Sequence, residues 1–223
     1  MTRDGSILAP ARPLGVRTLA LIGAGAGVSL VVAHALDPLV HEHVRTRDVY
    51  GDDLGRAFRV AGFVPLWLVV ALGMLLIDAR TRRAGGWRAV GERAYLLSAS
   101  VISSGLVAEL IKLLSRRLRP DDDLVYRFRP FDDATWSTGG IGFVSSHAAV
   151  AFGAAFVLCR LAPRLAPIWL LLGIGCGVTR LLDGAHWLSD VVGAAIVALL
   201  CVETVARTHR RPDAYDPPTG DQP

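Results

Sequence analysis

The chain has 223 residues, of which 52% are hydrophobic, and its mean hydropathy is +0.42. This length suffices for one domain, but the composition is too apolar for an ordinary soluble domain and indicates a membrane protein. The net charge of +4 comes from arginines in connections and tails rather than from a basic stripe on a polar face, so nucleic-acid binding is not expected.

Stretches long and apolar enough to approach a membrane-spanning helix, which takes about 20 residues, follow one another along the chain. They are 18–36, 60–77, 94–114, 146–162, 167–182 and 187–206. No run alternates with a period of two, as a barrel strand would. The sequence therefore predicts an all-α fold, a six-helix transmembrane bundle.

The two ends of the chain have a different composition from the centre. Residues 1–15 and 207–223 are rich in Pro, Gly, Asp and Arg and lack apolar periodicity, so we expect disordered tails around one transmembrane domain at 16–206. Placing both termini inside puts the larger share of the basic residues on the cytoplasmic side, as the positive-inside rule requires. Both tails are therefore expected to be cytoplasmic.

The first apolar stretch contains Gly23, Gly25 and Gly27. These glycines resemble a dinucleotide-binding loop only superficially, because no strand precedes them, and we expect them to allow close helix packing. The arginines before this stretch and the small-residue motif at 33–35 leave a cleaved signal peptide open. Cleavage would leave five spans without moving the candidate site.

The cysteines Cys159, Cys176 and Cys201 each lie inside an apolar run. Their odd number and their spacing fit neither a metal site nor a redox pair. We expect buried packing residues, and no metal site.

Polar residues gather in three groups at the ends of apolar stretches. The groups are Lys112 with Arg119 and Pro120, then Ser145, Ser146 and His147, then Arg180 with His186 and Asp190. If the spans alternate in direction, the end of the third span, the start of the fourth and the link from the fifth to the sixth emerge on one face of the membrane. The sequence therefore predicts that the three groups meet there.

Together these groups supply what phosphoryl transfer needs. Fixed cations neutralise phosphate oxygens, one imidazole attacks phosphorus and a second moves a proton. His186 and Asp190 are four residues apart at a helix start, so they stack on one face and the carboxylate can orient the ring. Ser145 and Ser146 open a helix after a glycine-rich run, where backbone amides bind anions and a serine can also cap the helix. His147 is suited to proton transfer.

Two neighbouring sets of charges call for different interpretations. Arg116 and Arg117 flank the third span, and we expect them to anchor lipid headgroups. Glu109 lies one helical turn before Lys112 and is expected to be its charge partner inside the bundle.

The three groups resemble the signature of the type 2 phosphatidic acid phosphatase family, which shares its site with vanadium haloperoxidases. The residues that match in type and spacing are Lys112, Arg119, Pro120, Ser145, His147, Arg180, His186 and Asp190. The chain departs from the pattern at Thr179, where the family has serine, and at Val144 and Ser146, where the family has proline and glycine.

The resemblance implies a role for each matching residue. His186 would be the nucleophile, His147 the acid and base, and Asp190 the orienting carboxylate. The phosphate would be held by Lys112, Arg119, Arg180, Ser145 and the backbone of Ser146. The implied reaction passes through a phosphohistidine and requires no metal and no other cofactor.

The predicted function is that of an integral membrane phosphatase of the cell membrane, with its site on the extracytoplasmic face. Its substrate would be a lipid phosphate or lipid pyrophosphate, either a polyprenyl pyrophosphate or a phospholipid phosphate, and its surroundings membrane lipids. Asp183 could contact a polar headgroup, and Trp136 and Trp187 could lie at the membrane interface. The altered middle group leaves open a non-catalytic binder or carrier of phosphorylated lipid, and vanadate-dependent peroxidase chemistry is a third alternative. The oligomeric state is left open.

Overall fold

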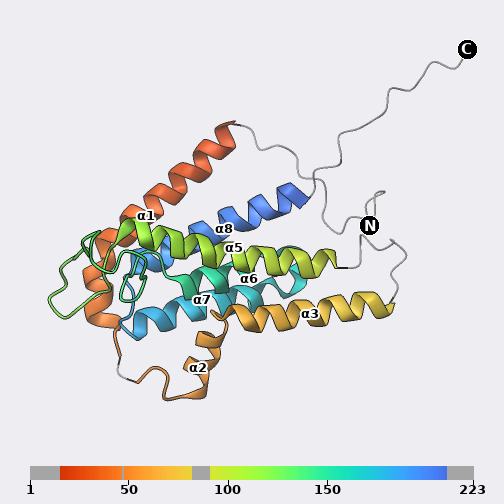
Figure 1. Cartoon of the computed structure of the whole chain (residues 1–223), viewed down its shortest axis with the longest axis horizontal. Coiled ribbons are helices and arrows are strands. Elements are labelled where there is room, and N and C mark those ends of the chain that lie inside the picture. Colours follow the sequence, from red (N-terminus) through yellow and green to blue (C-terminus); the bar gives the residue numbers. More distant parts are fainter. Residues whose placement is uncertain (1–15, 47, 82–90, 210–223) are drawn as a thin grey trace, which may run out of the picture.

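A computed structural model describes residues 16–46, 48–81 and 91–209, and within these ranges the chain forms helices and no strand (Figure 1). The all-α prediction is confirmed for this part of the chain. The helices are α1 (Val16–Val44), α2 (Asp53–Val60), α3 (Val64–Thr81), α5 (Glu92–Ser115), α6 (Ser146–Leu161), the 3-10 helix η1 (Pro163–Leu165), α7 (Ala166–Leu182) and α8 (Leu188–His209).

Fewer than six of the described helices have the length and hydropathy of a membrane span, so the predicted count of six spans is not confirmed. In the described ranges, 4 helices are long and apolar enough to cross a membrane: those at Ala20–Val44, Glu92–Ser115, Pro163–Leu182 and Leu188–His209. The pair α2 and α3, bent by 69° at the break between them, makes up to 5 if it counts as one span. Helix α6 covers the remaining predicted stretch but is a shorter apolar helix.

Helix α6 lies at the centre of the bundle and contacts α5, α7 and α8. Its sequence is rich in alanine, and ten of its residues are buried, which small side chains permit because neighbouring helices can approach closely. At Gly153 an added Cβ would lie 2.7 Å from Oγ of Ser104 on α5. The short helix is therefore enclosed by longer ones rather than exposed to lipid.

Helix α1 joins the bundle only through its second half. Ala33, Asp37 and His41 are buried there, where α1 contacts α7 and α8. At the three glycines of its first half an added Cβ would meet nothing within 4 Å. The prediction that these glycines allow close helix packing is therefore wrong for the described part of the chain, because α1 diverges from α8 towards its beginning (Figure 1).

The ends of the helices that carry the three polar groups lie at one end of the bundle, as predicted. In Figure 1 the ends of α5 and α7, the starts of α6 and α8, and the connection 116–145 all lie on the left. This connection is held by backbone pairing: Leu118 N donates to Arg127 O at 2.8 Å, and Gly142 N donates to Arg117 O at 2.7 Å. The segment after α5 is thus fixed between two later segments of the same connection.

At the other end of the bundle, α8 extends to His209, so the first three residues of the predicted C-terminal tail, 207–209, are helical rather than disordered. The remainder of that tail and the N-terminal tail lie outside the described residues.

Candidate active site

Direct hydrogen bonds join the three polar groups. Lys112 Nζ, in the last turn of α5, donates to Ser146 Oγ at 2.6 Å, which links the first group to the second. Ser145 N donates to Asp190 O at 3.2 Å, which links the second group to the third. Residues separated by most of the chain's second half therefore form one cluster.

His186 and Asp190 form the buried pair that their spacing predicts. The ring Nδ1 lies 3.3 Å from Asp190 Oδ2, and Trp187 N donates to the same oxygen at 2.9 Å. A carboxylate that accepts from Nδ1–H leaves the lone pair of Nε2 free for attack. Burial lowers the pKa of His186, while the hydrogen bond and charge of Asp190 act in the opposite direction. The net pKa of His186 is lowered, which favours the neutral ring, and the contact with Asp190 orients that ring.

Lys112 is buried, and two partners hold its ammonium group. Besides Ser146 it contacts Glu109 Oε1 at 2.9 Å, so the prediction that Glu109 is its charge partner is confirmed. A buried ammonium needs such partners because an unpaired charge away from water is costly. The pairing also fixes the direction in which Lys112 points.

Arg180, in the last turn of α7, is buried and held from two sides. Its Nη1 donates to Tyr50 Oη at 2.6 Å and lies 3.4 Å from Asp183 Oδ2. Its Nε is buried and has no hydrogen-bond partner among the described residues. Asp183 is thus an ion-pair partner of Arg180, and the guanidinium keeps donors for a ligand.

Arg119 and His147 complete the set through their charges rather than through hydrogen bonds. Arg119 is exposed and lies within electrostatic range of Arg180, Asp183, Asp190 and Glu109. His147 is half-buried at the start of α6 and lies within electrostatic range of Arg180, Arg59, His186 and Lys112. The two imidazoles and all three predicted cations therefore lie near one another at this end of the bundle.

Ser145 stands at the N-cap position of α6, but its side chain makes no capping hydrogen bond. Its Oγ is buried and has no partner within the described chain. A buried hydroxyl without a partner costs about 1–3 kcal/mol, so a bound anion that accepted from it would remove this cost. The geometry favours the ligand-binding interpretation of Ser145 over the capping one.

The prediction that Arg116 and Arg117 anchor lipid headgroups is wrong, because both side chains are buried. Helix α5 ends at Ser115, and Arg116 adopts a left-handed conformation with φ 55°, so the chain turns back over the bundle. The guanidinium of Arg116 then donates to backbone carbonyls of the connection, among them Pro130 O at 2.6 Å. That of Arg117 donates to the Asp190 carboxylate and, at 2.8 Å, to Ser189 Oγ.

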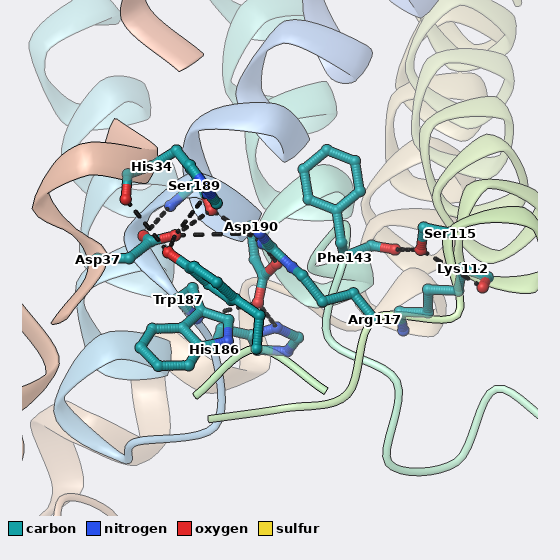
Figure 2. A network of polar contacts seen from close by, with 11 residues as sticks. His34, Asp37, Lys112, Ser115, Arg117, Phe143, His186, Trp187, Ser189 and Asp190 are labelled. Carbon is teal, nitrogen blue, oxygen red and sulfur yellow. Dashed lines mark hydrogen bonds and ion pairs between the residues drawn. The ribbon is translucent and has the colours of Figure 1, made fainter. Parts of the chain in front are cut away.

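Asp37 on α1 was not identified from the sequence. It is fully buried, accepts from Ser189 N at 2.7 Å and from Tyr126 Oη at 3.0 Å, and lies 3.9 Å from Arg117 Nη1. Figure 2 shows Asp190 in contact with His186 and Arg117, and Asp37 in contact with Ser189. A carboxylate at the end of an apolar stretch was the available signal, since such charges are rare without a partner or a function.

The predicted tryptophans and cysteines differ in how far they are buried. Trp187 is buried against the rings of His41 and Tyr126, so its predicted place at the membrane interface is wrong, whereas Trp136 is 86% exposed. Among the cysteines, Cys176 is buried, as predicted, and the other two are half-buried.

Comparison with known proteins agrees with this geometry. A family model described as the PAP2 superfamily matches residues 93–213, which include all three polar groups. The chain is similar to proteins named lipid A 1-phosphatase, 38% identical over 101 residues in Rhizobium etli and 38% identical over 104 residues in Rhizobium johnstonii. Each match covers 44% of this chain but only 42% and 40% of the relatives, so the chain spans about two fifths of their length. No solved structure matches the chain at a significant level.

Proposed function

The chain belongs to the PAP2 superfamily, and on this basis we propose that it is an integral membrane phosphatase that hydrolyses a lipid phosphate or lipid diphosphate. One observation supports this above all, a series of hydrogen bonds that connects the three polar groups. Lys112 bonds to Ser146, the neighbouring Ser145 bonds to Asp190, and Asp190 contacts His186. This series brings a clamp cation, a helix start and an oriented imidazole to one end of the bundle.

In the proposed reaction, Nε2 of His186 attacks phosphorus and the bond to the lipid oxygen breaks. His147 gives its proton to that oxygen, and the lipid product leaves. A water molecule then attacks the phosphohistidine and gives a proton to His147. The bond between phosphorus and His186 breaks, inorganic phosphate leaves, and both rings return to their starting state. Asp190 keeps the His186 ring in place in both steps.

The clamp would consist of Lys112, Arg119 and Arg180, joined by the Ser145 hydroxyl and the backbone amide of Ser146. These groups stabilise the charge that spreads over the phosphate oxygens, and Lys112 and Arg180 are already oriented by partners outside the reaction. Because Lys112 engages the Ser146 hydroxyl, the amide remains as the contribution of that residue. We therefore expect activity without the glycine of the family pattern.

A lipid substrate fits a site at the end of a helical bundle because its tail can remain in the membrane while its phosphate reaches the cations. We propose the extracytoplasmic face of the cell membrane for this site, which follows from the arginine distribution. The lipid A 1-phosphatases to which the chain is similar are, by their name, phosphatases of a lipid. A phospholipid or polyprenyl carrier is the substrate class proposed for this chain.

The test is phosphate release by the purified protein in detergent. Phosphatidic acid, phosphatidylglycerol phosphate and polyprenyl mono- and diphosphates should be compared, with and without EDTA. We expect release from at least one lipid, unaffected by EDTA and abolished by His186→Ala. Binding of these lipids without any phosphate release would favour a carrier instead, and release that persists in His186→Ala would overturn the assigned nucleophile.

A further inference from the structure

Arg59, on the short helix α2, is a cation that belongs to none of the three polar groups. Its guanidinium carbon lies 4.5 Å from the centroid of the Tyr50 ring, and the side chain is exposed. No acidic side chain in the described part of the chain forms an ion pair with it, whereas its neighbour Arg56 contacts Asp53 Oδ1 at 3.2 Å. Arg59 therefore offers a charge that is oriented by Tyr50 and has no acidic partner among the described residues.

Tyr50 ties Arg59 to the clamp. Its hydroxyl accepts from Arg180 Nη1 at 2.6 Å, and the Arg180 guanidinium lies 5.9 Å from the same ring. One tyrosine thus contacts both arginines, the first through a stacked guanidinium and the second through a hydrogen bond. The position of Arg59 is coupled to that of a proposed phosphate ligand.

The segment that carries Arg59 is also packed directly on His147. At Gly62 an added Cβ would lie 2.8 Å from His147 Cβ and 2.9 Å from its carbonyl oxygen. The Phe63 ring centroid lies 6.4 Å from that of His147. On the preceding turn, the Phe58 ring rests against Gly175 of α7, where an added Cβ would come within 2.3 Å of it. These contacts place Arg59 on the side of the site where His147 lies.

The leaving group would depart on the His147 side of the site, because His147 is the residue that would protonate the departing oxygen. An alcohol that leaves from a lipid monophosphate is neutral once protonated and gains little from a nearby cation. The group that leaves from a lipid diphosphate is itself a phosphate monoester, which carries negative charge. A cation beside His147 therefore favours the diphosphate through charge that is present only on its leaving group.

We propose that Arg59, supported by Tyr50, binds the inner phosphate of a lipid diphosphate and makes this class of substrate the preferred one. This inference rests on the proposed function and assigns the substrate class of the same site. His186 attacks the terminal phosphorus, and the bond from that phosphorus to the bridging oxygen breaks. The lipid monophosphate leaves next to Arg59, and water then releases the terminal phosphate from His186.

The experiment compares two substrates with the same tail, farnesyl diphosphate and farnesyl monophosphate, offered to the full chain in detergent. Initial rates of phosphate release give kcat/KM for each. For Arg59→Gln we expect kcat/KM on the diphosphate to fall about tenfold or more, while the value on the monophosphate stays within about threefold. Arg59→Lys should recover part of the loss. Arg56→Gln makes the same charge change on the same helix and should leave both substrates unaffected.

The outcomes separate the two proposals. An equal loss on both substrates, or no loss on the diphosphate, overturns the role of Arg59 while the phosphatase assignment stands. Wild-type protein that releases phosphate from neither substrate, nor from any lipid in the wider panel, overturns the proposed function itself.

Discussion

Arg117 donates to the Asp190 carboxylate through one oxygen while His186 contacts the other oxygen of the same group. The carboxylate is thus fixed between a buried guanidinium and the proposed nucleophile. Asp37 of α1 lies 3.9 Å from Arg117 and holds Ser189, the residue before Asp190, through its backbone and side chain. The orientation of His186 therefore depends on helix α1 as well as on the helix that carries Asp190.

Replacement of Arg117 tests this dependence. Arg117→Met leaves Asp190 and Asp37 without their buried cation, and breaking a buried pair costs about 3–5 kcal/mol of stability. We expect kcat to fall about tenfold or more with KM nearly unchanged, because Arg117 positions the pair and does not touch substrate. Arg117→Lys should keep the fold and part of the rate. Arg127→Gln, which removes exposed ion pairs in the same connection, is the control.

The outcome that contradicts this role is a rise in KM at constant kcat for Arg117→Lys, since that pattern belongs to a residue that binds substrate directly. Thermal unfolding of each variant in detergent, measured alongside the kinetics, separates a loss of fold from a loss of orientation.

The glycine-rich connection before α6 offers a second test. At Gly142 an added Cβ would lie 2.8 Å from Asp190 Oδ2 and 3.3 Å from Leu118 O, whereas at Gly139 its nearest neighbour is Ser137 Oγ at 3.4 Å. Gly142→Ala should therefore displace the Asp190 carboxylate and lower kcat about tenfold or more, since small misplacements at a catalytic group are costly. Gly139→Ala should retain wild-type kinetics. Equal activity of the two variants would show that the carboxylate tolerates the displacement.

The pH dependence follows from the environment of His186. Burial lowers the pKa of this imidazole, as do the charges of Arg180 and Arg119, while Asp190 raises it. A lowered pKa keeps the ring neutral and nucleophilic below the ordinary value of about 6.5, so the acid limb of kcat/KM should lie below that pH. Asp190→Asn removes the interaction that raises the pKa and should move this limb further to acid pH while reducing the rate. A limb that moves towards neutral pH would be incompatible with these charges.

Variants of Lys112 and Glu109 distinguish a residue that binds phosphate from one that only supports such a residue. Lys112→Met removes a proposed phosphate ligand and should lower kcat/KM by about a hundredfold to a thousandfold. Glu109→Gln leaves Lys112 its hydrogen bond to Ser146 and should cost less than about tenfold, as expected for a partner that does not touch phosphate. Phosphate release measured at low substrate concentration reports both values. Similar losses in the two variants would mean that the ion pair, not the free ammonium, is what the reaction needs.

The sequence alone determined the long apolar helices, though not the short helix α2, and the residues of the three polar groups. Long apolar runs form helices in a membrane because only helices and closed barrels satisfy backbone polar groups there. The motif residues lie at the ends of those runs, and the alternation of helix direction brings such ends to one side. The sequence therefore sufficed to place Lys112, Ser146, His186 and Asp190 together.

The tertiary structure decided which other residues support the site. Arg117 faces inward because the chain turns back at Arg116, and a flanking arginine looks the same in sequence whether it faces lipid or protein. Asp37 reaches Ser189 across 152 residues, and Arg59 reaches the side of His147 because α2 packs on α7. Local propensity and hydropathy carry no information about such contacts, since these depend on which helix faces pack against each other.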